Sequence, residues 1–355
     1  MYELNEKVRS LTPYEPISGK YPVRLDANES FLSLPEELRE EIGRAVSRAA
    51  FQRYPDPLAG KVTEAFADFY GISPSLVTVG NGSDELLYLL TSTMLMRGES
   101  MLVLEPDFSM YRFYGSLSEV EVVSCPKRED LTIDVDEVIR RAKEANARLI
   151  LFSNPCNPTS LGLPRQEVRR LVRSVEALVV LDEAYMDFWD QSLLPQVEEY
   201  ENLVILRTCS KALGLASLRL GFAVANRRLT GALRAVKSPY NVNSLSQTVG
   251  ALVLREKEWA SYALGQILAS RDELQAALDS LAAEFPGQLQ VYRSCTNFIF
   301  LKPAGAAGLF EGLLEAGVAV RRMGEFLRVT AGSQEENRRF LEAFRSLFRE
   351  GRAAE

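Results

Sequence analysis

The chain has 355 residues, of which 46% are apolar and 25% are charged, and this composition excludes a disordered chain, a collagen and a disulfide-rich miniprotein. Its net charge of −7 argues against a nucleic-acid-binding protein, which normally carries a basic field. Because histidine is absent, imidazole-dependent triads and dyads are excluded, and catalysis would have to use Lys, Tyr, Asp, Glu or a bound cofactor.

The first 30 residues predict an extended arm. They contain Pro13, Pro16, Gly19 and Pro22, and they lack the periodicity of a helix or a strand. An amphipathic helix is expected next, over residues 35–51.

Strands and helices then alternate. Apolar runs typical of buried strands lie at residues 76–79, 101–104, 120–123, 149–152, 178–181, 204–206 and 220–224, and helical patterns lie at residues 60–70, 84–96, 134–146 and 164–175. This alternation predicts an α/β fold with a mostly parallel, seven-stranded sheet flanked by helices on both faces.

The C-terminal part predicts a smaller α+β domain. Residues 244–285 form one long helical pattern, which we expect to bend near Gly265. After it we expect a strand pair, a helix, two short strands and a final helix over residues 333–348. The expected division is therefore an arm (1–30), a large domain (31–245) and a small domain that includes the long helix (246–355).

Cellular context follows from the cysteines and from the apolar runs. The four cysteines form no C-x-x-C pair and have no histidine partners, so we expect reduced thiols and no metal site; they are Cys125, Cys156, Cys209 and Cys295. The N-terminus is too polar for a signal peptide, and no apolar run approaches the ~18 residues of a membrane span. We therefore expect a cytoplasmic protein.

Two polar motifs follow apolar strands, where ligands bind in parallel sheets. Gly80-Asn81-Gly82-Ser83-Asp84-Glu85 opens a helix, and free N–H groups there suit a phosphate, although the third glycine of a dinucleotide fingerprint is missing. Asn154-Pro155-Cys156-Asn157-Pro158-Thr159 predicts a rigid loop with fixed Asn side chains. Each motif is also compatible with a purely structural turn.

Two further motifs carry stronger chemistry. Asp182 ends an apolar strand, where a carboxylate is costly to desolvate unless it meets a cation or a proton, and Tyr185 follows it. Lys211 has apolar and hydroxyl neighbours, which should lower its pKa and favour Schiff-base chemistry. Arg219, with Thr208 and Ser210, could cradle a phosphate.

Together with residues 25–29, 53–56, 240–243 and 327–330, these motifs resemble the fold-type I, pyridoxal-phosphate-dependent aminotransferases over nearly the whole chain. Within that family they are most similar to the histidinol-phosphate aminotransferase subfamily. The resemblance implies that Lys211 binds the cofactor covalently and moves the substrate proton. It also implies that Asp182 pairs with the protonated ring nitrogen, and that Tyr185 and Asn157 hydrogen-bond the ring's hydroxyl oxygen.

The resemblance also implies how the rest of the cofactor and the subunits are arranged. Phe108 would stack on the ring, and Tyr54 would reach the cofactor phosphate of a neighbouring subunit, which implies a homodimer. The phosphate itself would be held by a set of backbone and side-chain donors, namely Gly82, Ser83, the backbone N–H of Asp84, Thr208, Ser210 and Arg219.

The same resemblance places the substrate. Arg328 would bind the substrate α-carboxylate and Arg321 its distal anion, while Tyr14 and Asn28 could close over it. The sequence departs from the subfamily pattern at Phe108, where tyrosine is more frequent, and at Cys156 and Ser160, where asparagine and glycine are usual.

These departures leave the substrate open. Histidinol phosphate with 2-oxoglutarate is the leading pair, whereas the alternatives are an aromatic amino acid donor or decarboxylation of O-phosphothreonine. A ligand-sensing regulator on the same fold would normally carry an added DNA-binding domain, and this acidic chain enters its cofactor fold almost at once.

Overall fold

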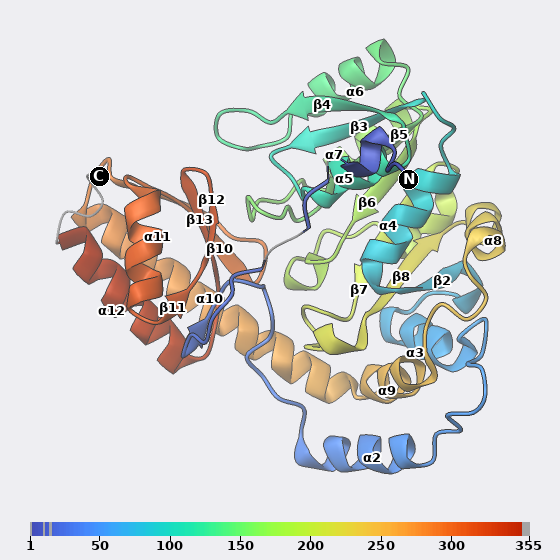
Figure 1. Ribbon diagram of the computed structural model, residues 1–355, viewed down its shortest axis with the longest axis horizontal. Coiled ribbons are helices and arrows are strands. Elements are labelled where there is room, and N and C mark those ends of the chain that lie inside the picture. The colour runs from blue at the N-terminus through green and yellow to red at the C-terminus, as the bar shows by residue number, and fades with distance from the viewer. Residues whose placement is uncertain (1, 10, 14–15, 350–355) are drawn as a thin grey trace.

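The computed structural model describes residues 2–9, 11–13 and 16–349, and a seven-stranded sheet is its largest element, in the order β2-β8-β7-β6-β5-β3-β4 (Figure 1). Six of its strands run in the same direction, while β8 runs antiparallel to both of its neighbours, β2 and β7. The seven strands are β2 (Val77–Asn81), β3 (Ser100–Glu105), β4 (Glu121–Pro126), β5 (Leu149–Ser153), β6 (Leu178–Asp182), β7 (Leu203–Thr208) and β8 (Leu220–Ala225). The predicted fold class is confirmed.

Helices cover both faces of this sheet. Successive residues of each strand point to opposite sides, so apolar strands give the sheet two apolar faces. Along β5, Ile150 and Phe152 join one apolar cluster and Leu149 and Leu151 join another. The first cluster includes residues of α2 (Glu36–Ser47), α3 (Gly60–Tyr70), α6 (Val135–Glu144), α7 (Arg165–Ser174) and α9 (Ser244–Arg255), and the second includes residues of α4 (Gly82–Thr93), α5 (Met110–Leu117) and α8 (Arg227–Val236).

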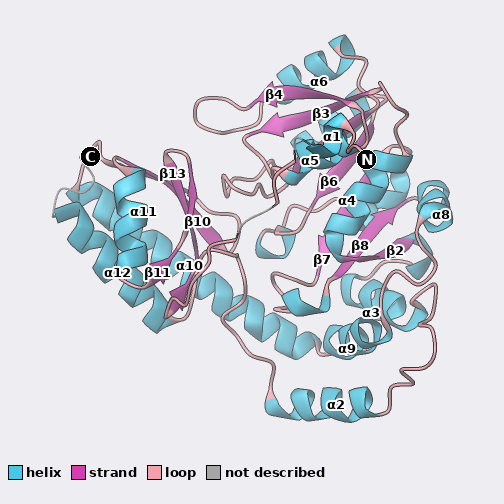
Figure 2. Ribbon diagram, in the orientation of Figure 1, coloured by secondary structure: helices cyan, strands magenta, loops and turns pink. Residues whose placement is uncertain are grey.

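A third apolar cluster lies in the C-terminal part, around a four-stranded antiparallel sheet in the order β12-β13-β10-β9 (Figure 2). Its elements are β9 (Leu289–Tyr292), β10 (Phe298–Pro303), β12 (Arg321–Met323), β13 (Phe326–Thr330), α10 (Lys257–Glu284), α11 (Ala306–Glu315) and α12 (Gln334–Arg349). Figure 1 shows α10 running from this small sheet toward α9 and the large sheet.

Two differences from the sequence-based expectations have physical causes. The long helix is interrupted at Glu256, between α9 and α10, and not at Gly265, which lies inside α10. A single glycine costs a helix only about 1 kcal/mol relative to alanine, and α10 has 28 residues over which to absorb that cost.

The N-terminal stretch contains two short elements where we expected no regular structure. In α1 (Glu6–Arg9), the Asn5 side chain accepts a hydrogen bond from the N–H of Val8, 3.0 Å away, as a helix cap does. In β1 (Val23–Arg24), the strand pairs in parallel with β11 (Val318–Ala319), a partner almost 300 positions away that local sequence cannot reveal.

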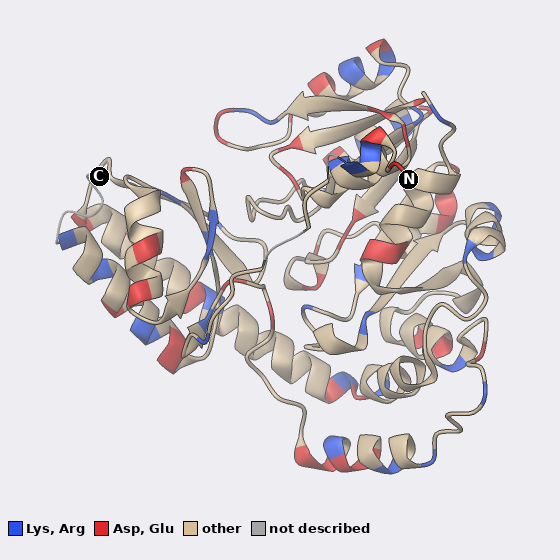
Figure 3. Ribbon diagram, viewed as in Figure 1, with Lys and Arg blue, Asp and Glu red and all other residues tan. Residues whose placement is uncertain are grey.

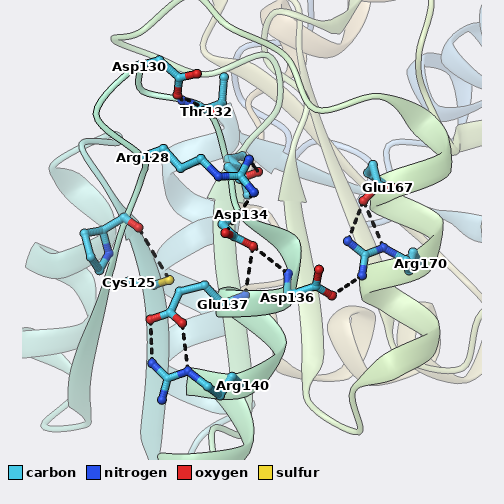
Figure 4. A network of polar contacts seen from close by, with 12 residues as sticks. Cys125, Arg128, Asp130, Thr132, Asp134, Asp136, Glu137, Arg140, Glu167 and Arg170 are labelled. Atoms are coloured by element: carbon cyan, nitrogen blue, oxygen red, sulfur yellow. Dashed lines mark hydrogen bonds and ion pairs between the residues drawn. The ribbon is translucent and has the colours of Figure 1, made fainter.

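The surface helices carry charges of both signs, while the strands of the large sheet are almost free of charge in this view (Figure 3). Figure 4 shows one such surface network, in which Asp134 caps α6 and Arg170 of α7 contacts Asp136 and Glu167. Exposed pairs of this kind add little stability, and this network includes none of the predicted site residues. Within the described residues, no helix has the length and apolar character that crossing a bilayer requires.

Candidate active site

A cavity of about 680 Å³ opens at the edge of the large sheet where β5, β6 and β7 end. The last residues of these strands, Ser153, Asp182 and Thr208, all line it, as expected for ligands of a parallel sheet. The predicted site residues that line the cavity are Asn28, Ser83, Asp84, Phe108, Asn157, Asp182, Tyr185, Thr208, Ser210, Lys211, Arg219, Arg321 and Arg328.

Lys211 lies just after β7 and projects its amine into this cavity. Burial lowers the pKa of Lys211 to about 8, and the nearby guanidinium of Arg328 acts in the same direction. The Nζ atom donates a hydrogen bond to the carbonyl of Ala27, 3.1 Å away. About a tenth of this amine is therefore unprotonated at pH 7, far more than for an ordinary lysine, and the unprotonated amine is the form that attacks a carbonyl carbon.

Asp182 is the buried carboxylate at the end of β6, with 5% of its surface exposed. Its oxygens accept hydrogen bonds from the Tyr111 hydroxyl at 2.9 Å and from the Ala184 N–H at 3.1 Å. Burial raises the pKa of Asp182 to about 7. Within the described residues no Lys or Arg forms an ion pair with it, so the chain provides a buried acid and leaves a cationic partner to be supplied from the cavity.

Tyr185 and Asn28 form a second polar pair on the cavity wall. The Asn28 amide donates to the Tyr185 hydroxyl at 2.8 Å, and burial raises the pKa of Tyr185. Asn28 is itself fully buried and is held by Thr330 and Asn297. We expected Asn28 to close over a substrate, and the structure places it as a fixed support of the Tyr185 phenol.

Two arginines of the small sheet line the same cavity. In the antiparallel ladder Arg321 of β12 lies opposite Arg328 of β13, so both side chains project from one face. Arg328 donates to the side-chain oxygen of Asn157 and to the carbonyl of Asp26, each at 2.6 Å. Both guanidinium groups line the cavity, where they can donate hydrogen bonds to anionic groups of a ligand.

The opposite end of the cavity collects donors for another anion. Ser83 and Asp84 lie in the first turn of α4, whose N–H groups have no acceptor within the helix. The Arg219 guanidinium lies 3.0 Å from the Asp84 carboxylate and 3.5 Å from the Ser210 hydroxyl, and Thr208 donates to Ser210 at 3.0 Å. The Asp84 side chain therefore pairs with Arg219, a contact that a bound phosphate would share.

Gly82 explains how the arginine comes so close to the helix. Its φ of 80° lies in the left-handed region, and a Cβ at this position would lie 2.7 Å from an Arg219 guanidinium nitrogen. Any larger residue would displace the guanidinium, so the absence of a side chain at Gly82 keeps open the space in which an anion would meet Arg219 and the helix N-terminus.

Tyr111 is the site residue that the sequence did not reveal. It follows Phe108 by three positions, packs edge-on against that ring at 5.5 Å, and reaches Asp182 across 71 positions of sequence. An aromatic residue near the start of a helix is usually part of the core, and only the fold identifies its partner. Other lining residues that we did not predict include Arg24, Asp26, Glu29 and Asp107.

One predicted residue lies away from the cavity, and another falls outside the residues that the structure describes. Tyr54 is 81% exposed, does not line the cavity and stacks on Tyr240 with ring centroids 4.6 Å apart. Tyr14 lies outside the described residues.

The geometry fits pyridoxal 5′-phosphate on three counts. An amine of lowered pKa lines the same cavity as a buried carboxylate that has no cationic partner within the described chain, and a separate anion cradle lies at the helix N-terminus. Arg321 and Arg328 line the same cavity and could contact a second ligand. This donor set suits an aromatic, cationic ring that carries a phosphate.

Comparisons with known proteins agree with this fit. The family model for class I and II aminotransferases matches residues 21–344. The chain is similar to the histidinol-phosphate aminotransferases of Clostridium novyi (37% identity, 93% of each chain covered) and Thermococcus gammatolerans (39% identity, 96% of each). It is also 36% identical to that of Pyrococcus furiosus, with 98% of each chain covered.

Solved structures share the fold. The histidinol-phosphate aminotransferase of Sinorhizobium meliloti, in complex with pyridoxal-5′-phosphate, superposes with a TM-score of 0.89 at 20% identity, over 99% of this chain and 98% of the other. The L-threonine-O-3-phosphate decarboxylase of Porphyromonas gingivalis reaches 0.78 at 22% identity, over 92% of this chain and 99% of its own. At these identities the likeness concerns the fold alone.

Proposed function

We propose that this chain, which belongs to the class I and II aminotransferase family, transfers the amino group of L-histidinol phosphate to 2-oxoglutarate. Its cofactor is pyridoxal 5′-phosphate. The products would be imidazole acetol phosphate and glutamate, and the reaction would serve histidine biosynthesis. The observation that carries this choice is the pair Arg321 and Arg328 on one cavity wall, together with the near full-length similarity to histidinol-phosphate aminotransferases.

When bound, the cofactor supplies an aldehyde for the amino group and a ring that accepts electrons from the substrate carbon. Lys211 would hold the cofactor and, through its weakly basic amine, accept the proton from the donor's Cα. Asp182 would keep a proton on the ring nitrogen, and Tyr185 with Asn157 would donate or accept at the ring's hydroxyl oxygen. Phe108 would stack on the ring.

The anion sites divide between cofactor and substrate. The phosphate of the cofactor would lie among the α4 N-terminus and the side chains of Thr208, Ser210 and Arg219. Arg321 and Arg328 would bind the substrates. Their ligands would be the phosphate of histidinol phosphate in one half-reaction and the carboxylates of 2-oxoglutarate and glutamate in the other.

The function is tested by single half-reactions of the purified holoenzyme. Histidinol phosphate should convert the bound cofactor from its aldehyde to its amine form, and 2-oxoglutarate should restore it, as seen in the absorption spectrum. A response to phenylalanine or tyrosine but not to histidinol phosphate would select the aromatic alternative. Release of carbon dioxide from O-phosphothreonine without a 2-oxo acid would select the decarboxylase.

Arg321 makes a prediction about specificity. R321A should raise KM for histidinol phosphate by about 10- to 100-fold, because a charged hydrogen bond to the phosphate is lost. With histidinol, which lacks the phosphate, the variant and the wild type should react at similar rates. R322A is the matched control, since Arg322 is exposed on the same strand and does not line the cavity. Equal losses with both donors would refute the assignment.

Tyr111 makes a prediction about pH. Its hydroxyl lowers the pKa of Asp182, so Y111F should raise that pKa, shift the acid limb of kcat/KM to higher pH and reduce kcat/KM by about tenfold. Y200F is the matched control, because the buried Tyr200 hydroxyl has no hydrogen-bond partner within the described structure. A pH profile unchanged in Y111F would contradict the role of Tyr111.

We also propose a homodimer in which Tyr54 completes the neighbouring subunit's phosphate site, and the exposed Tyr54–Tyr240 stack supports this. We propose a cytoplasmic location as well, which the four unbridged cysteines support.

Inactive Y54A and K211A subunits, mixed at equal amounts and allowed to exchange, should regain about a quarter of wild-type activity. Half of the dimers are then heterodimers, and each heterodimer contains one intact site. If Tyr54 acted within its own subunit, mixing would restore nothing.

A further inference from the structure

Lys127 and Cys156 form a buried pair beside the cavity, and neither side chain has a role in the proposed transamination. The Lys127 Nζ lies 2.8 Å from the Cys156 Sγ, with 2% of the lysine side chain and 1% of the cysteine exposed. Lys127 directly follows β4, and Cys156 lies between the two prolines of the loop after β5. This cysteine is one of the positions where the sequence departs from its subfamily.

Further contacts fix the position of the Lys127 amine. The ammonium also donates to the carbonyl of Pro106 at 2.8 Å and lies 3.6 Å from the Asp107 carboxylate. Burial on its own lowers the pKa of Lys127, but its contacts with Cys156 and Asp107 raise that pKa overall. These contacts hold the Lys127 amine against the Cys156 sulfur, so the two atoms that a cross-link would join are kept together inside the fold.

We propose that this pair is an oxidative modification site, at which a peroxide joins Lys127 and Cys156 through one bridging oxygen atom. A separation of 2.8 Å is too long for a direct nitrogen–sulfur bond, but two single bonds through one intervening atom can span it. The pair is therefore placed for an N–O–S cross-link without movement of the backbone.

The reaction balances with hydrogen peroxide as the oxidant. The S–H bond of Cys156 and two N–H bonds of the Lys127 ammonium break, with one hydrogen released as a proton; an S–O and an N–O bond form, and the O–O bonds of two peroxide molecules break. One peroxide oxygen becomes the bridge and the other three leave as water, so that sulfur and nitrogen each lose two electrons. The protein gains about 14 Da, one oxygen less two hydrogens.

The cross-link would act on the cavity through Asp107. Asp107 lines the cavity and accepts hydrogen bonds from the N–H and the hydroxyl of Ser153, and the Ser153 hydroxyl accepts one from the N–H of Asn157 at 3.1 Å. Bridging converts the ammonium into a neutral group, so Asp107 loses its buried counter-charge. The segments that carry Phe108 and Asn157 would then rearrange, and activity should fall.

The competing site is Cys295, which is the most exposed of the four cysteines and has a pKa raised by burial. If exposure alone decided, oxidation would begin there. If contact with Lys127 determines which cysteine reacts with peroxide, Cys156 reacts first even though it is buried. This contrast separates the proposal from general thiol damage.

The holoenzyme is treated with a small molar excess of hydrogen peroxide and analysed by intact mass and by peptide mapping. We expect a gain of about 14 Da, a linked peptide containing Lys127 and Cys156, and reversal of both by dithiothreitol. C295A should cross-link like the wild type, whereas C156A should not. Unlinked sulfenic or sulfinic acid at Cys156, oxidation at Cys295 alone, or no change in mass would each overturn the proposal.

A second measurement tests the coupling to the cavity. Activity should fall in step with the linked species, recover with dithiothreitol, and resist the same peroxide treatment in C156A. Equal inactivation of C156A and the wild type would overturn the coupling, and the mass measurement would still decide the cross-link. Because the mass readout needs no substrate, neither result depends on which amino donor the enzyme uses.

Discussion

Replacing Lys211 by alanine is expected to lower the rate of amino-group transfer by about 10⁴-fold or more, because one side chain both holds the cofactor and moves the substrate proton. The chain contains no histidine that could substitute as a base. Burial and Arg328 lower the pKa of Lys211 to about 8, so its amine is suited to proton transfer near neutral pH, and no other lysine lines the cavity among the described residues.

K211R separates chemistry from charge. It keeps a cation in the cavity but cannot bind an aldehyde carbon, so it should be as inactive as K211A. Small primary amines should partly restore K211A, which has space for them, and should not restore K211R. The control is K237R, since the amine of Lys237 is also partly buried but contacts Pro57 and Asn241 outside the cavity. Wild-type turnover by either Lys211 variant would refute the mechanism.

D182N is expected to reduce kcat/KM by about 10²- to 10³-fold, because the amide is nearly isosteric but carries no charge for the ring nitrogen. The carboxylate is buried at the strand end, and Tyr111 and Ala184 orient it. The loss of activity should appear in kcat more than in the affinity for the amino donor, since the proposed contact of Asp182 is with the cofactor and not with the substrate.

The free energy of unfolding of D182N distinguishes this loss of kcat/KM from misfolding. The pKa of Asp182 is raised to about 7 in the folded, cofactor-free chain, so its contribution to stability is complete at low pH and declines as the pH rises through that value. At pH 8 the cofactor-free D182N should therefore be more stable than the wild type, by up to about 4 kcal/mol. Chemical denaturation measures this. An active D182N, or one that unfolds more easily at pH 8, would contradict the role of Asp182.

Sequence reasoning predicted the strand-end residues well. Asp182 and Lys211 each follow an apolar run, and the carboxyl ends of parallel strands necessarily meet at one edge of the sheet. Their positions in the cavity therefore depend only on the class of fold, which the alternation of strands and helices indicates.

The remaining contacts depend on pairings between distant segments. The hydrogen bond from Tyr111 to Asp182 and that from Asn28 to Tyr185 join residues 71 and 157 positions apart. The common face of Arg321 and Arg328 follows from an antiparallel register around the tight turn at Gly324. No local pattern encodes such contacts, and the same is true of the contact between Lys127 and Cys156, which are 29 positions apart.

If the amine of Lys211 carries the cofactor, borohydride reduction of the holoenzyme should fix the cofactor on that side chain, and peptide mass spectrometry can locate it. We expect one reduced pyridoxyl phosphate per chain, attached to the peptide that contains Lys211 and to no other. A reduced holoenzyme with an unmodified Lys211, or with the cofactor fixed on another lysine, would contradict it.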